Sequence, residues 1–216
     1  MTEKLLAAIN AKYNLIEQDP GSFKKLKANG MTFHIRTFRA EGLGWVSLMG
    51  ASGFFGLMKM DTLIINPMQA DMPLLSYDRV YAMGNDTLIF ELYDTLIGEA
   101  DLGAVMDAKA AHAALPEHDL GKHWYDDIKL PESISKKGKK NQTAAFDALT
   151  EKYMDAFLRC CQSAAPSETA QKRANSSVYV EGLLSHGGPS TDVFKKAIGE
   201  DKTAQLFRYV LFGTKA

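Results

Sequence analysis

The chain has 216 residues, of which 46% are hydrophobic and 24% are charged. This composition is typical of a globular protein, and the length allows one substantial core, so a single domain over 1–216 is expected. The 25 Lys and Arg residues nearly balance the 26 Asp and Glu residues, and the net charge of −1 excludes a general electrostatic attraction to nucleic acid or to an anionic membrane.

No targeting or membrane segment is expected. Charged residues are spread through positions 1–13, unlike a signal peptide, and no run approaches the ~20 apolar residues of a membrane span. Cys160 and Cys161 are adjacent in a stretch with helical periodicity, so their side chains point ~100° apart and cannot easily form a disulfide. We expect them to be buried thiols in a reducing compartment, and the protein to be cytoplasmic.

The first half of the chain predicts one helix followed by strands. Leu5, Ile9, Tyr13 and Ile16 recur at helical spacing, which predicts a helix over 3–16 that ends before Asp19-Pro20-Gly21. From residue 31, short apolar and β-branched runs separated by Gly, Pro, Asn and Asp predict a largely antiparallel sheet. The predicted strands are Met31–Arg39, Trp45–Gly50, Met58–Asn66, Ser76–Met83 and Thr87–Tyr93.

Helical periodicity returns after about residue 100. It predicts helices over Leu102–Leu115, around Phe146 to Cys161, around Val193 to Ile198 and around Leu206 to Leu211. Between them, His123–Leu130 is a candidate further strand and Ser135–Asn141 is expected to be a basic loop. Strands first and helices later indicate an α+β fold in which the helices pack on the sheet.

The most informative residue is Asp78, an isolated carboxylate in the middle of the predicted strand Ser76–Met83. The turn Gly84-Asn85-Asp86 connects this strand to the next, which carries a second acid, Glu91. A buried and unpaired acid is costly, so its presence in a strand suggests chemistry. The simpler interpretation is a solvent-facing residue at the edge of the sheet.

Other kinds of site have no support. The sequence has no Gly-x-Gly-x-x-Gly, no Walker-type Gly-Lys-Ser/Thr and no Gly-x-Ser-x-Gly. The five histidines lack the spacing of metal ligands, so a metal centre is not expected. Chemistry based on carboxylates remains. The histidines are His34, His112, His118, His123 and His186.

Two blocks of sequence resemble a known family. Asp71-Met72-Pro73-Leu74-Leu75-Ser76-Tyr77-Asp78-Arg79-Val80, followed by a Gly turn and a strand with Glu91, resembles the central motif of the ferredoxin-dependent bilin reductases. The second block is similar to the carboxy-terminal signature of that superfamily, which includes red chlorophyll catabolite reductase. It begins at Tyr179-Val180-Glu181, passes through Gly187-Gly188-Pro189 and Ala197-Ile198-Gly199-Glu200, and ends at Tyr209-Val210-Leu211-Phe212. The blocks cover roughly residues 31–95 and 176–213.

The resemblance implies a three-layer α/β/α sandwich with one antiparallel sheet, and an open-chain tetrapyrrole held between the sheet and the carboxy-terminal helices. It implies a reductase of a biliverdin-type bilin that has no tightly bound cofactor and takes single electrons from ferredoxin. Protons then come from the protein, and burial raises the pKa of an acid so that it keeps a proton near neutral pH. Asp78 is the matching residue.

This chain also departs from the family. Asp61 and Met49 fall at or near positions where the phycocyanobilin-forming branch has a catalytic His and Glu, and Gly187-Gly188-Pro189 replaces an Asn-Asp-Pro-like segment that carries a second Asp. A non-catalytic tetrapyrrole carrier and a reductase of a chlorophyll catabolite are therefore alternatives. A third is an unrelated α+β interaction domain.

The remaining candidate residues follow from the same reasoning. If their strands are neighbours, Asp61 could share a face with Asp78 and raise its pKa; for both Asp61 and Glu91, a plain surface role is the alternative. Arg36, Arg39 and Arg79 are available to bind propionates, and His186 beside Gly188 could contact a pigment or be an ordinary loop residue. The lysines of 136–140 form either a solvated loop or a landing site for an acidic ferredoxin.

Overall fold

The computed structural model describes residues 1–216 and is built around one antiparallel sheet of eight strands. The strand order is β1-β3-β4-β5-β6-β7-β8, and β2 pairs with the part of the β3 edge that β1 leaves free. The strands are β1 Leu15–Gln18, β2 Lys25–Ala28, β3 Met31–Ala40, β4 Gly44–Gly53, β5 Met58–Pro67, β6 Leu74–Ala82, β7 Asn85–Tyr93 and β8 Ile134–Lys139.

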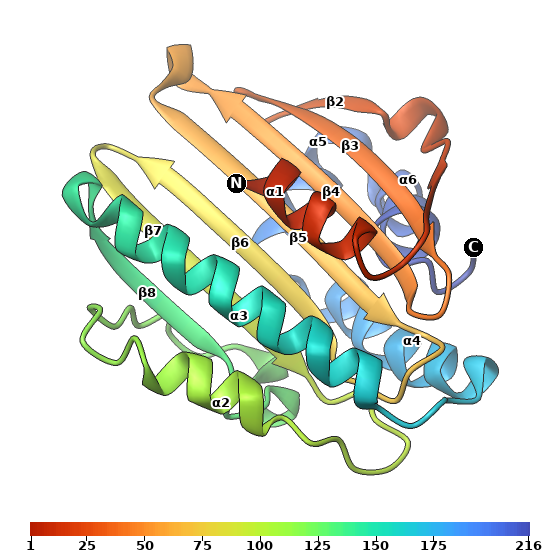
Figure 1. The fold of residues 1–216 in the computed structure, drawn as a ribbon. Coiled ribbons are helices and arrows are strands. Elements are labelled where there is room, and N and C mark those ends of the chain that lie inside the picture. Colours follow the sequence, from red (N-terminus) through yellow and green to blue (C-terminus); the bar gives the residue numbers. More distant parts are fainter.

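Helices cover both faces of this sheet. Figure 1 shows α1, α2 and α3 in front of it and α4, α5 and α6 behind it. The helices are α1 Thr2–Asn10, α2 Gly103–Ala110, α3 Thr143–Ser163, α4 Thr169–His186, α5 Pro189–Ile198 and α6 Glu200–Gln205; the short segments are η1 Gly21–Phe23, η2 Phe54–Gly56, η3 Trp124–Ile128, η4 Lys140–Gln142 and the π-helical η5 Leu206–Leu211. The α+β class and the three-layer sandwich predicted from the sequence are confirmed. None of the helices is both long and apolar enough to cross a membrane.

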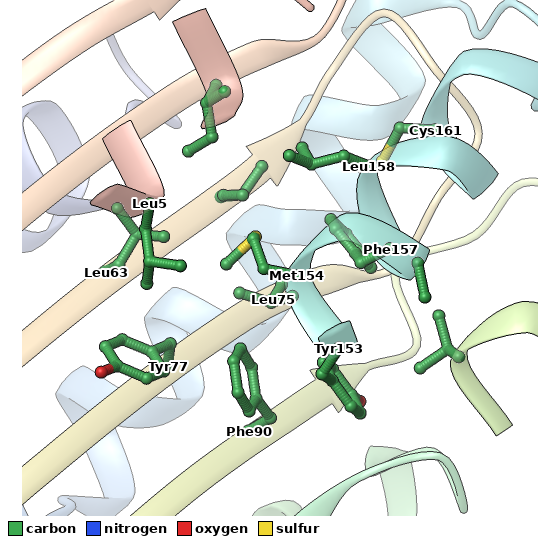
Figure 2. Packing of buried hydrophobic residues seen from close by; sticks show 14 of the residues in the cluster. Leu5, Leu63, Leu75, Tyr77, Phe90, Tyr153, Met154, Phe157, Leu158 and Cys161 are labelled. Atoms are coloured by element: carbon green, nitrogen blue, oxygen red, sulfur yellow. The ribbon is translucent and has the colours of Figure 1, made fainter. Parts of the chain in front are cut away.

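The face toward α3 holds the larger hydrophobic cluster. Buried side chains of α3 recur every three or four residues and so form one stripe that packs on the sheet (Figure 2). Tyr153 of α3 stacks on Phe90 of β7 at 4.3 Å between ring centroids, and Tyr77 of β6 contacts the same Phe90 at 5.0 Å. Cys160 and Cys161 are buried here as free thiols, as expected.

The opposite face is covered by the carboxy-terminal third of the chain. Side chains of the sheet donate hydrogen bonds to the last carbonyls of η5 and the residue after it, at 2.7–2.8 Å. The donors are Trp45, Ser47 and Asn66, and the acceptors are the carbonyls of Val210, Leu211 and Phe212. Because the last carbonyls of a helix have no intrahelical donors, these hydrogen bonds from the sheet satisfy them and fix η5 in place.

Three segments differ from the expectation, and β2 and α4 form where no element was predicted. The predicted helix over 3–16 ends at Asn10, because Leu15 and Ile16 pair with the free edge of β3 instead. The predicted strand His123–Leu130 is the single turn η3, in which the Asp126 carboxylate accepts from the His123 backbone N–H.

The predicted basic loop 135–141 is largely strand β8. Lys136 lies in it almost fully buried, and its ammonium reaches the carbonyl of Leu115 at 3.0 Å and the carboxylate of Glu117. A long lysine stem can pass through apolar surroundings when its charged end finds acceptors, so charge alone did not exclude a strand.

Candidate functional site

A cavity of about 290 Å³ lies between the sheet and the carboxy-terminal helices. Its floor is one face of β4 to β7, where alternate residues of each strand point the same way. Its other walls are residues 120–125, the end of α4, the start of α5, and η5 with Phe212. Most lining residues are hydrophobic. The floor consists of Met49, Met60, Thr62, Ile64, Ser76, Asp78, Val80, Ile89, Glu91 and Tyr93.

Asp78 is in the middle of this floor. It lies opposite Thr62 of β5, whose hydroxyl donates to its Oδ1 at 2.5 Å. Burial raises the pKa of Asp78 to about 6, the Thr62 hydrogen bond opposes this shift, and the nearby Glu91 adds to it. A carboxyl with this pKa is present in both its protonated and its ionised form near neutral pH. This suits a group that gives and regains a proton.

Glu91 is the second carboxylate of the floor. Ser76 is its partner in the register between β6 and β7, so Glu91 is a diagonal neighbour of Asp78 on the same face. The Tyr93 hydroxyl donates to its Oε2 at 2.6 Å, and Lys129 Nζ lies 3.7 Å from Oε1. Burial raises the pKa of Tyr93 well above its usual value, so the phenol stays neutral and donates. Glu91 Oε1 is buried and has no hydrogen-bond partner.

Aromatic side chains form one wall. Tyr93 stacks on Tyr179 of α4 at 4.1 Å between centroids, and Tyr125 meets Tyr93 edge-on at 5.6 Å. His123 stacks on Tyr125 with centroids 4.8 Å apart. Flat rings in a mostly hydrophobic pocket can accommodate a flat conjugated ligand.

The structure brings together only some of the sequence-predicted residues. Asp78 and Glu91 share the floor, and Gly188 lines the cavity at the start of α5. His186 is exposed at the end of α4 and is not part of the lining, because its ring packs against Trp124, 5.5 Å away between centroids.

Three predicted residues lie on the opposite face of the sheet. Asp61 is on β5, next to β6 as anticipated, but the antiparallel register pairs Thr62 with Asp78 and Asp61 with Arg79, so Asp61 points away from Asp78. Burial raises the pKa of Asp61 there. The prediction that Asp61 shares a face with Asp78 is therefore wrong.

The two predicted arginines, Arg79 and Arg36, also lie on the face away from the cavity. Arg79 is fully buried under α3, where it pairs with Asp86, donating to Oδ2 at 2.7 Å, and also with Asp147 at 3.2 Å. Arg36 is bound by Glu17, with Nε 2.9 Å from Oε1. Arg39, weighed for the same role, is exposed near Glu41. None of these arginines lines the cavity.

Sequence reasoning missed His123, Tyr125 and Tyr179 as site residues. Tyr179 stood inside the resemblance but without a role, and His123 and Tyr125 were assigned to a strand. Their signal is weak, because a segment without periodicity does not reveal which way its side chains point.

Comparisons with known proteins identify the fold. No family model matches the sequence, and no curated protein matches it. Among solved structures, the chain is similar to the crystal structure of phytochromobilin synthase from tomato in complex with biliverdin, with a TM-score of 0.73 and 16% sequence identity. The match covers 99% of this chain and 82% of that chain. The likeness shows a shared fold over nearly the whole chain, the same fold that the resemblance in the sequence implies.

Proposed function

We propose that this protein is a bilin reductase-like oxidoreductase that reduces a linear tetrapyrrole of the biliverdin type. In this proposal electrons come singly from ferredoxin, protons come from side chains of the cavity, and no cofactor is permanently bound. The observation that carries it is a half-buried carboxylate, Asp78, on the floor of an apolar cavity with an aromatic wall. The tomato enzyme of the same fold holds biliverdin, which gives the proposal its substrate class.

Asp78 would act as a proton donor to the pigment. A bound tetrapyrrole would exclude water from the cavity. This further desolvation would raise the pKa of Asp78 above about 6, and the carboxyl would then be mostly protonated. Thr62 holds one carboxyl oxygen, which fixes the direction of the group. These features allow Asp78 to be protonated when the pigment accepts an electron.

Glu91 would bind the pigment. Its carboxylate accepts from the Tyr93 phenol through Oε2, and the ammonium of Lys129 lies 3.7 Å from Oε1. The unpartnered Oε1 can accept from pyrrole or lactam N–H groups, which a linear tetrapyrrole carries along one edge. The two carboxylates therefore differ in role, Glu91 as an acceptor and Asp78 as an acid.

The propionate groups of the pigment need a partner other than Arg36, Arg39 and Arg79, because none of these arginines lines the cavity. α5 begins at the cavity with Pro189, Ser190 and Thr191, and no side chain caps its first N–H groups. A helix start of this kind favours an anionic group, so we assign the propionate end of the pigment to it.

The first test is binding. Purified protein is titrated with biliverdin while the visible spectrum is recorded, and a red-shifted or intensified band at micromolar protein is expected. An unchanged spectrum would count against both a reductase and a carrier, and would favour the unrelated interaction domain.

The second test is turnover. Under anaerobic conditions, reduced ferredoxin and biliverdin are expected to give a new bilin, identified by chromatography. Binding without product would support the carrier, which Met49 and Gly188 favour, since they line the cavity at or near positions where relatives have catalytic groups. If the protein forms product from a chlorophyll catabolite and not from biliverdin, it is a reductase of chlorophyll catabolites.

We place the protein in the cytoplasm, because its two buried thiols are unpaired.

A further inference from the structure

His123 is the one histidine that lines the cavity. Its Nδ1 is buried and has no hydrogen-bond partner, while the residue as a whole is half-buried and follows two exposed residues, Gly121 and Lys122. The ring therefore lies between the solvent and the cavity. A buried polar atom without a partner costs about 1–3 kcal/mol, so such an atom at the wall of a cavity points to a ligand.

The position of this ring is fixed from two sides. It stacks almost parallel on Tyr125, at an angle of 6° between the ring planes. The next residue, Trp124, donates from Nε1 to the Gly187 carbonyl at 2.9 Å. Trp124 also packs directly on Gly182 of α4, where an added Cβ would come within 2.2 Å of the indole. Because Trp124 is anchored to α4, His123 is held against the cavity.

His123 is one of only two cavity residues with an unpartnered buried polar atom. The other is Glu91; the remaining such atoms belong to Tyr13, Thr37, Tyr77 and Ser135, none of which lines the cavity. The titratable and charged groups around His123 are Tyr125, Asp126 and Lys129 from its own segment, Asp78, Glu91 and Tyr93 from the sheet, and Tyr179 from α4. Among the sheet groups, Asp78 and Glu91 already have distinct roles.

We propose that His123 supplies the second proton of the reduction, an inference that rests on the proposed function. Reducing one double bond of the pigment takes two electrons and two protons. Two reduced ferredoxins each give one electron, Asp78 gives one proton to the pigment, and the His123 imidazolium gives the other. Both residues then regain protons from water, and the products are the dihydro pigment and two oxidised ferredoxins.

The experiment compares His123→Gln with the wild type in single-turnover reduction of bound biliverdin by reduced ferredoxin. Gln keeps a polar side chain but has no proton of suitable pKa. Biliverdin affinity is expected to stay within about threefold, while the step after the first electron slows roughly 10²-fold, the usual scale for losing a general acid. A one-electron bilin radical should accumulate and be visible by electron paramagnetic resonance. His186→Gln is the matched control, because this histidine lies nearby but outside the cavity, and it should behave like the wild type.

A second variant guards against a purely structural effect. His123→Ala leaves a space beside Tyr125, and added imidazole should restore the slow step without changing affinity. The inference is overturned if His123→Gln forms product at the wild-type rate, if no radical accumulates, if affinity falls with the rate, or if imidazole does not rescue His123→Ala. A wild-type protein that binds biliverdin but forms no product overturns the proposed function as well, whereas wild-type turnover with an unaffected His123→Gln overturns this inference alone.

Discussion

The two faces of the sheet are built from alternate residues of the same strands and have opposite character. Toward α3 the space is filled by stacked aromatic rings, and the buried arginine on that face has its carboxylate partners. Toward α4 and α5 the sheet lines a cavity whose floor carries two carboxylates, Asp78 and Glu91. Asp78 and Arg79 are adjacent in sequence yet belong to different faces. The comparison shows how one strand can serve stability with one set of side chains and ligand chemistry with the other.

The largest effect is expected on the filled face, from Arg79→Met. The change leaves Asp86 buried without its guanidinium, and removing one partner of a buried pair costs about 3–5 kcal/mol of unfolding free energy. Urea denaturation followed by circular dichroism measures it. Asp61→Asn is the control on the same face, and its free energy of unfolding should change by less than ~1 kcal/mol. Equal stabilities for the two variants would show that the buried pair is not what supports this face.

On the cavity face, Asp78→Asn should impair chemistry and spare the fold. Asn keeps the shape and can still accept from Thr62, but it has no proton of suitable pKa to give. Product formation should fall roughly 10²-fold or more, about 2.7 kcal/mol in the barrier, while biliverdin binding persists. Anaerobic turnover and a spectroscopic titration measure the two quantities. Turnover at the wild-type rate would mean that Asp78 is not the donor, and failure to fold would make it structural.

The same variant should gain stability in a way that depends on pH. The pKa of Asp78 rises from 3.8 to about 6 on folding, so the folded state binds this proton more tightly. That contribution to stability is complete below pH 4 and is lost as the pH rises through 6, whereas Asn loses nothing. Above pH 6, Asp78→Asn should therefore be more stable than the wild type by roughly 1–2 kcal/mol, with the difference shrinking toward pH 4.

Denaturation at pH 4, 5, 6 and 7.5 tests this linkage. The exposed Asp127 offers the control substitution Asp127→Asn, which should match the wild type at each pH. Parallel pH profiles for Asp78→Asn and the wild type would contradict the raised pKa.

The smallest expected effect is on biliverdin affinity, compared between one variant on each face of the sheet. Glu91→Gln removes the negative charge at the unpartnered oxygen, so biliverdin should bind about 10-fold more weakly, or about 1.4 kcal/mol. Arg36→Gln changes an exposed pair with Glu17 on the other face and should leave the dissociation constant unchanged. If Arg36→Gln weakens binding and Glu91→Gln does not, the pigment is not held where we place it.

Much of the fold could be predicted from the sequence, because alternation and helical spacing are local patterns. The strands from β3 to β7, most helices of the carboxy-terminal half and the α+β class followed from them. β1, β2, β8 and α4 did not. Leu15-Ile16 continues a helical pattern, and Lys136 is buried through distant acceptors. Those interactions are made in three dimensions and leave little trace in a local window.

The candidate site was less predictable for the same reason. Asp78 stands out because a lone acid in an apolar strand is unusual. Asp61 was misplaced because the face of a residue depends on the register between strands, and a shift of one position reverses it. His123 was overlooked as a site residue because its place at the cavity depends on Trp124 packing against α4, 58 residues or more along the chain.

The cavity walls come from strands near the middle of the chain, from residues 120–125 and from the last 40 residues, so no single part of the sequence contains the site. A ligand that fits it binds only the completely folded chain. By mass action, pigment at 100 times its dissociation constant would then stabilise the whole protein by about 2.7 kcal/mol. The supply of pigment would in this way set the lifetime of the protein toward proteolysis, with unliganded chains degraded first.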